Sequence, residues 1–241
     1  MADFEITHGS AIPATAETGE RIAAFLRAAY GWMCAGLAIT AVTAWFVASS
    51  PALLTTIARS GPLYLGLFIA QLGIVFVLSS RVQRLSAATA SWLFIGYSVL
   101  TGVTLSFLML VYTGQTLTST FVVAAGMFGA MALYGTVTRS DLSGWGQFLF
   151  MGLIGVVIAS VVGMFWQSDG LQFVLGFCGV IVFTGLAAYD AQRLKAMALA
   201  IPSGAGSGGS SSYAVVGALT LYLDFINLFL MLLRFLGDRR R

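Results

Sequence analysis

Two aspartates, Asp190 and Asp224, are the acidic side chains that fall inside long apolar segments of this 241-residue sequence. The other acidic residues lie near the chain ends or between apolar segments: Asp3, Glu5, Glu17, Glu20, Asp141, Asp169 and Asp238. Asp224 is the more central, because the apolar run from Tyr213 to Arg234 extends roughly 15 Å to either side of it as a helix. A carboxylate in the middle of a bilayer costs at least about 2.5–3.5 kcal/mol. We therefore expect Asp224 to face the protein interior and to have a partner there.

Asp190 permits two interpretations from its neighbours. Arg193 follows it by three residues, which favours a solvated ion pair at the membrane surface that contributes little energy. The apolar pattern nevertheless continues past Asp190 through Met197 to Ile201, which favours a more deeply buried carboxyl group. The sequence leaves both interpretations open.

Asn227 and Arg234 extend a polar stripe from Asp224 along a helix otherwise lined with Leu, Phe and Met. Asn227 lies one turn beyond Asp224, and Arg234 follows Asn227 at a heptad spacing. A helix with such a stripe is expected at the centre of a bundle. The alternative is that Asp224 is a protonated or hydrogen-bonded packing residue that fixes only the helix register.

If both aspartates face inward, their separation of 34 residues lets two adjacent helices bring them together. Two carboxyl groups in a dry site share a proton and titrate as a unit, so the pair is predicted to sense pH. When ionised, it offers the oxygen ligands that Ca2+ prefers. Aspartic hydrolases use a similar pair, and Tyr189–Asp190 is similar to a motif of intramembrane aspartyl proteases. Their second motif, Gly-x-Gly-Asp, is absent, because Leu221–Tyr222–Leu223 precedes Asp224.

The composition places both aspartates in a membrane protein. Hydrophobic residues make up 59% of the chain and charged residues 9%, with a mean hydropathy of +0.92, whereas roughly a quarter of a soluble domain is charged. Apolar runs of about 20 residues are long enough to cross a bilayer as helices. Seven are found: residues 22–49, 62–80, 87–112, 117–138, 145–166, 171–194 and 212–236. The expected fold is an all-α bundle of seven transmembrane helices, since no run alternates like a barrel strand.

Other residue types exclude several kinds of chemistry. His8 is the single histidine and lies near the N-terminus, which excludes a histidine relay or a His-ligated metal inside the bundle. Lys195 is the single lysine and lies at the end of an apolar run, which excludes a Schiff base deep in a helix. Cys34 and Cys178 are too few for a zinc site. The net charge of +3 comes from basic residues at the ends of apolar runs, so neither a tightly bound cofactor nor a nucleic-acid partner is expected.

The basic residues predict a cytoplasmic N-terminus. That orientation places seven of the 12 basic residues inside and leaves Arg59 in an outer loop; the seven are Arg21, Arg27, Arg81, Arg84, Arg139, Arg193 and Lys195. The four others, Arg234 and residues 239–241, follow the last run and would lie outside if it crosses the membrane. A re-entrant last segment would keep them inside, but its helical length of about 36 Å favours a crossing.

The chain is expected to form one transmembrane domain over residues 21–236. Residues 1–20 are predicted to be a mobile polar tail, and residues 237–241 a basic tail. Residues 202–212, PSGAGSGGSSS, have the composition of a flexible linker between the sixth and seventh helices.

Three motifs resemble those of the Bax inhibitor family, also called the transmembrane Bax inhibitor motif family. The run LYLDFINLFLMLLR, residues 221–234, is similar to that family's C-terminal helix nearly throughout. AAYDAQ, residues 187–192, resembles its sixth-helix aspartate motif, and TGVTLSF, from Thr101, fits the pattern of its third helix. The resemblance covers the chain from about residue 20.

The resemblance implies a seven-helix bundle around a central C-terminal helix, and a calcium leak controlled by a hydrogen-bonded aspartate pair. At matching positions the pair is Asp190 and Asp224, with both carboxylates as ligands of the transported Ca2+. An arginine that latches onto the pair matches Arg84, with Arg81 as the alternative, while Asn227, Arg234 and Arg193 are expected polar supports. The resemblance thus implies a non-enzymatic, pH-sensitive calcium leak channel of the cytoplasmic membrane. We expect a monomer in the lipid bilayer that passes Ca2+ and is gated by binding of protons to the pair.

Two other functions are kept as alternatives. Some bacterial relatives bind and restrain a membrane-embedded quality-control protease, which implies a role as a protease-binding protein. An intramembrane aspartyl protease is the second, because it too needs two carboxyl groups that share a proton.

Overall fold

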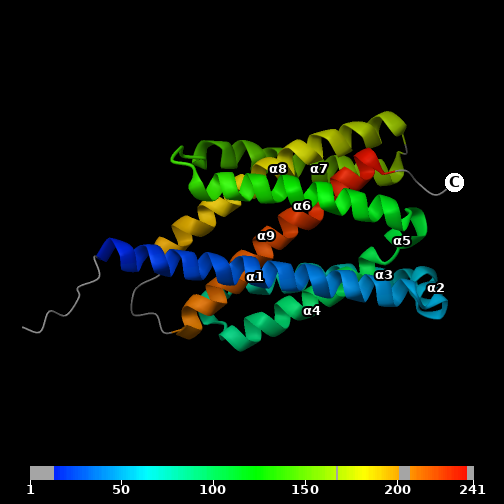
Figure 1. Ribbon diagram of the computed structural model, residues 1–241. Helices are drawn as coiled ribbons and strands as arrows, with labels where there is room; N and C mark the ends of the chain where they lie inside the picture. The colour runs from blue at the N-terminus through cyan, green and yellow to red at the C-terminus, as the bar shows by residue number, and fades with distance from the viewer. Residues whose placement is uncertain (1–13, 167, 201–206, 238–241) are drawn as a thin grey trace, which may run out of the picture.

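The computed structural model describes residues 14–166, 168–200 and 207–237, and this part of the chain is built from helices (Figure 1). The long helices are α1 (Ala14–Ala48), α3 (Gly61–Ser80), α4 (Ala87–Leu105), α6 (Gly114–Val137), α7 (Ser143–Phe165), α8 (Asp169–Ala200) and α9 (Ser207–Leu236). The short ones are α2 (Pro51–Arg59), the 3-10 helix η1 (Val82–Arg84) and α5 (Leu108–Val111). Among the described residues, seven segments are long and apolar enough to cross a membrane. The predicted all-α, seven-span fold class is confirmed.

Local sequence signals set several helix boundaries. The hydroxyl groups of Ser86 and Thr113 cap α4 and α6, where they accept hydrogen bonds from the backbone N–H groups of Thr89 at 3.1 Å and Thr116 at 3.2 Å. Pro51 begins α2, a position where its missing N–H leaves no helical hydrogen bond unmade. The spans therefore begin close to the predicted positions.

Helix α9 lies at the centre of the bundle. In its most apolar stretch 67% of the residues are buried, compared with 6–44% in the other six spans. It packs against α1, α4, α6 and α8, and Figure 1 shows it crossing obliquely among them. The ring of Tyr222 meets Phe94 and Tyr97 of α4 edge to face, with ring centroids 5.7 and 5.8 Å apart. The C-terminal helix is central, as the sequence predicts.

Glycines bring α8 close to both α6 and α9. A Cβ atom at Gly135 of α6 would overlap the carbonyl oxygen of Ala188 in α8. A Cβ atom at Gly179 of α8 would lie 2.5 Å from the Met231 side chain of α9. Small residues permit this close approach of helices in a membrane. The two contacts hold α8, and the carboxyl group that it carries, against the central helix.

The chain ends of the bundle differ from the sequence-based boundaries. Helix α1 begins at Ala14, so residues 14–20 of the predicted N-terminal tail are helical. Helix α9 begins at Ser207, inside the predicted linker 202–212. Residues 1–13, 201–206 and 238–241, which hold the rest of the predicted tails and linker, lie outside the described residues.

The last helix agrees with the sequence-based expectation, whereas a short helix, α2, was not expected. The first turn of α1 and the last turn of α9 lie at opposite ends of the bundle (Figure 1). This arrangement supports a crossing of the last segment over a re-entrant one. Helix α2, Pro51–Arg59, lies in the outer loop where no helix is predicted, because a nine-residue helix is too short to give the signal of a span.

Candidate functional site

Asp190 of α8 and Asp224 of α9 meet between the helices, with their carboxyl groups close enough to interact in one cavity. The Asp224 residue is 6% exposed and the Asp190 side chain 10%. A hydrogen bond between two carboxyl groups requires a proton on one of them, because an ionised carboxylate can only accept. A direct hydrogen bond between Asp190 and Asp224 would therefore need one shared proton.

The pair lies in a cavity of about 470 Å³ that is walled by α7, α8 and α9. Besides the two aspartates, the cavity is lined by the polar side chains of Gln147, Thr220 and Asn227 and by the guanidinium group of Arg193. Oδ2 of Asp224 is buried and has no hydrogen-bond partner among the described residues. A buried oxygen of this kind is available to a proton, a water molecule or a cation that enters the cavity.

Helix α7 closes one wall of the cavity through a glycine. A Cβ atom at Gly146 would lie 2.5 Å from the ring of Tyr189, so the ring lies against the bare backbone of α7. Tyr189 lines the aspartate cavity and also a second cavity of about 500 Å³ between α6, α7 and α8. The Tyr189 ring therefore separates the aspartates from a groove on the outer surface of the bundle.

Arg193 stands at the edge of the aspartate cavity. Its Nη1 lies 3.9 Å from Oδ1 of Asp190, and its side chain is 65% exposed. Asp190 thus has a buried partner on α9 and an exposed cation one turn along α8. The two interpretations of Asp190 left open by the sequence both describe part of its surroundings.

The remaining predicted site residues occupy different positions. Asn227 lines the cavity, whereas Arg234 lies half-buried in the last turn of α9, roughly 15 Å from Asp224 along the helix. Arg81 and Arg84 are exposed at the end of α3 and in η1. Within the described part of the chain, no ion pair joins either arginine to an aspartate.

The position of η1 explains the distance between Arg84 and the pair. The hydroxyl group of Ser212, near the start of α9, donates a hydrogen bond to the Leu85 carbonyl oxygen at 3.0 Å. Ser212 is 12 residues from Asp224, which is roughly 18 Å along the helix. A contact between Arg84 and the pair therefore requires another arrangement of the helices.

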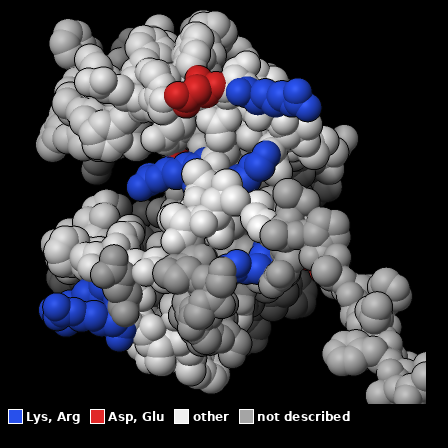
Figure 2. Space-filling view, turned by 90° about the vertical axis from the view of Figure 1, so that its left-hand side faces the viewer, with Lys and Arg blue, Asp and Glu red and all other residues white. Residues whose placement is uncertain are grey.

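Basic residues gather on the end of the bundle nearest the aspartate pair. Figure 2 shows Lys and Arg side chains spread across this end and few acidic ones. Lys195 of α8 donates to the Thr136 carbonyl oxygen at 2.8 Å, at the C-terminal end of α6, where a cation is favourable. Asp141 accepts a hydrogen bond from the Ser143 backbone N–H at 2.9 Å, and this bond lowers the pKa of its exposed carboxyl group.

A buried hydroxyl network on the other side of α9 was missed by the sequence analysis. Thr40 of α1 donates to the Ser98 carbonyl oxygen of α4 at 2.9 Å, and its hydroxyl lies 2.6 Å from that of Tyr222. Since Thr40 already donates its hydrogen, Tyr222 is the donor between them. The sequence analysis also missed Gln147 and Thr220 as residues of the site. A glutamine within the apolar run that forms α7 is a signal in the sequence that could have identified Gln147.

The acidic residues are too few to form a metal centre of several carboxylates. Among the described residues, no three His, Cys, Asp or Glu side chains come together. Two carboxyl groups with nearby amide and hydroxyl oxygens suit a cation that passes through better than one that is held tightly.

Comparison with known proteins identifies the family. Residues 22–241 match the family described as "Inhibitor of apoptosis-promoting Bax1". The chain is 51% identical over 216 residues to the inner membrane protein YbhL of Escherichia coli strain K12, covering 90% of this chain and 92% of that protein. A protein of Borreliella burgdorferi is 42% identical with the same coverage, and one of Caulobacter vibrioides is 36% identical across the whole of both chains. The chain therefore belongs to the Bax inhibitor family of membrane proteins.

Proposed function

We propose that this protein is a pH-sensitive calcium leak channel of the cytoplasmic membrane, in which the proton shared by Asp190 and Asp224 controls the passage of Ca2+. The observation that carries the proposal is the pair of neighbouring carboxyl groups inside a cavity of about 470 Å³. The family of the chain and its similarity to an inner membrane protein support the proposed membrane location and the proposed class of function. In this proposal it is not an enzyme and holds no tightly bound cofactor.

The chemistry follows from the charge of the pair. When the shared proton leaves, two carboxylates face each other in a buried site and attract a divalent cation. The oxygens of Asn227, Gln147 and Thr220 in the cavity lining supply further ligands of the kind that Ca2+ prefers. When the proton is present, the pair satisfies itself by its own hydrogen bond and its attraction for a cation falls.

Arg84 acts in this proposal as a competing cation. A second arrangement of the helices would bring the Arg84 guanidinium to the ionised pair. There it would neutralise the negative charge that Ca2+ needs for binding. In the conformation described, Arg84 is exposed and stands apart from the pair, so the latch is open. Arg81 is the neighbouring residue that could take the same role.

The test is Ca2+ uptake into proteoliposomes between about pH 5 and pH 8, a window in which an ordinary aspartate stays ionised. Wild-type uptake is expected to change with pH, and uptake by Asp190→Asn and Asp224→Asn is expected to be independent of it. Asp141→Asn is the matched control. The Ser143 N–H lowers the pKa of the Asp141 carboxyl group, so this group does not titrate in the window. Wild-type uptake that does not vary with pH would contradict the proposed switch.

The two alternatives give different results with the same proteins. A protease-binding protein would show no Ca2+ uptake but would co-purify with a membrane protease. An intramembrane aspartyl protease would cleave a helical substrate, and either Asn variant would abolish the cleavage.

A further inference from the structure

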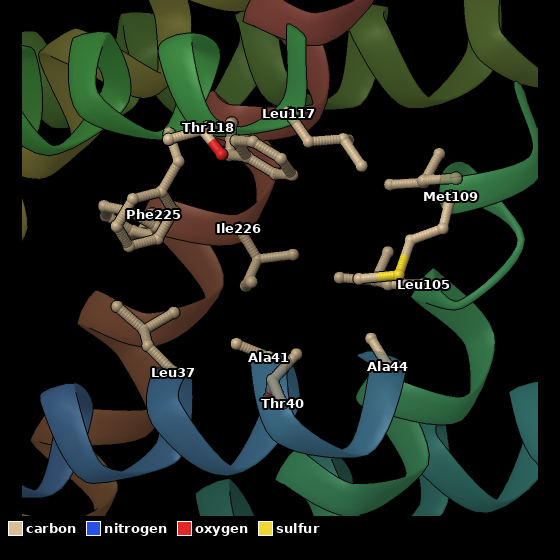
Figure 3. Close-up of a pocket in the computed structure, with 13 residues that line it drawn as sticks. Leu37, Thr40, Ala41, Ala44, Leu105, Met109, Leu117, Thr118, Phe225 and Ile226 are labelled. Atoms are coloured by element: carbon tan, nitrogen blue, oxygen red, sulfur yellow. The ribbon is translucent and has the colours of Figure 1, made fainter. Parts of the chain in front are cut away.

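An apolar cavity opens between α1 and α6, away from the aspartate pair (Figure 3). We name it the α1–α6 cavity; it has a volume of about 270 Å³. Figure 3 shows Leu37 and Ala41 of α1 facing Leu117 of α6, with Ile226 of the central helix between them and Leu105 of α4 at the side. The cavity therefore reaches from the bundle surface to α9.

The lining of the α1–α6 cavity offers a water molecule almost no hydrogen-bonding groups. Thr40 contributes a hydroxyl group, but that group already donates to the Ser98 carbonyl oxygen and accepts from Tyr222. The other hydroxyl is that of Thr118, an exposed residue of α6. A water molecule in a buried cavity needs two to four polar partners, and apolar cavities without them stay dry. The occupant that fits this lining is a hydrocarbon.

The cavity opens toward the lipid. All its walls belong to segments that are apolar enough to cross a membrane, from α1, α4 with α5, α6 and α9. Helices α1 and α6 both pack against α8 and α9 but make at most a marginal contact with each other in the described part of the chain. At its edge, Phe121 of α6 is 43% exposed, and Val42, next to Ala41, is 65% exposed.

We propose that the α1–α6 cavity binds one acyl chain of a membrane lipid, which enters sideways between α1 and α6 and contacts Ile226. The volume holds about nine groups of the size of a water molecule or a methylene, at about 30 Å³ each. An empty space of that size leaves its lining atoms without contacts on one side. The apolar molecules that are available in a bilayer to fill this space are the acyl chains of lipids. This proposal does not depend on calcium transport.

The test uses proteoliposomes of phosphatidylethanolamine and phosphatidylglycerol that contain a trace of a phospholipid with a diazirine on one acyl chain. After irradiation, the labelled positions are mapped by peptide mass spectrometry. We expect label on Ile226 and Leu105, which lie inside the cavity, as well as on the exposed Val42. Label on the central helix is diagnostic, because α9 is otherwise mostly enclosed.

Two substitutions on α1 form a matched pair. Ala41→Phe fills the cavity from its edge and should reduce the labelling of Ile226 by about tenfold, a loss of about 1.4 kcal/mol in binding. Val42→Phe adds a ring one residue along, on the lipid-facing side, and should leave Ile226 labelled. Thr118→Phe fills the cavity from α6 and replaces Ala41→Phe if that variant does not fold.

Label confined to exposed positions such as Val42 and Phe121, with none on Ile226, would overturn the proposal. It would mean that α1 and α6 close on each other in the bilayer. Equal labelling of Ile226 in wild type and in both filled variants would also overturn it, because the label would then reach α9 by another path.

Discussion

Tyr222 and Asp224 lie two residues apart on α9 and point to opposite sides of it. Tyr222 hydrogen bonds to Thr40 of α1 at 2.6 Å, while Asp224 lies beside Asp190 of α8. Residues spaced two positions apart on a helix are separated by roughly 200° of rotation about the helix axis. The central helix is therefore fixed on one side by uncharged groups and carries the ionisable pair on the other.

The anchor on the α1 side can be tested by Tyr222→Phe. The substitution keeps the ring contacts with Phe94 and Tyr97 and removes the hydrogen bond to Thr40, which should lower the free energy of unfolding by about 0.5–1.5 kcal/mol. Thermal unfolding in detergent measures this change. The control is Tyr64→Phe, since Tyr64 is 48% exposed on α3; equal losses in the two variants would show that the Thr40 bond does not anchor α9.

The contact between α6 and α8 gives a second prediction about stability. Gly135→Ala places a methyl group against the Ala188 carbonyl oxygen and should cost about 1–3 kcal/mol, as other overpacked sites do. Gly129→Ala, on the same helix, meets open space and should be neutral or stabilising by up to about 1 kcal/mol, because alanine favours a helix over glycine. A Gly135→Ala protein as stable as Gly129→Ala would mean that α6 can move away from α8 at little cost.

The sequence predicts the bundle and the meeting of the two aspartates for the same physical reason. Apolar length sets the number of spans, and a carboxyl group in lipid must find a polar partner inside the protein. Asp190 and Asp224 are the acidic residues within the spans that meet this requirement. Chemistry and chain length allow this contact, although Arg193 leaves the burial of Asp190 open, and the resemblance to the Bax inhibitor family implies it.

Other features depend on three-dimensional packing that the sequence does not show. Thr40 and Tyr222 carry little cost in a membrane helix, so nothing in the sequence marks them as partners. Helix α9 begins at Ser207, against the low helix propensity of a glycine-serine stretch. The position of Arg84 depends on which arrangement of the helices is considered, and spacing along the chain cannot specify that.

The shared proton can be observed directly by infrared spectroscopy. The proposed sharing of one proton by Asp190 and Asp224 predicts a carboxylic acid C=O band that is absent from Asp190→Asn and from Asp224→Asn. Asp141→Asn should retain the band, since the Asp141 carboxyl group is exposed and its pKa is lowered. A band that persists in both pair variants would assign the proton to another group.

Arg193 gives a prediction about the entry of a cation into the aspartate cavity from the basic end of the bundle. Its guanidinium lies 3.9 Å from Asp190 and is 65% exposed at the edge of the cavity, so it repels a cation that approaches the pair from that end. Exposed ion pairs are worth up to about 1 kcal/mol; Arg193→Gln should therefore raise Ca2+ uptake by up to about fivefold, measured in proteoliposomes at low salt. Lys195→Gln removes a charge from the same turns of α8, but Lys195 points to the Thr136 carbonyl oxygen of α6 and should leave uptake unchanged. If both substitutions raise uptake equally, the total charge of this end of the bundle controls the cation, and the position of Arg193 beside Asp190 has no special role.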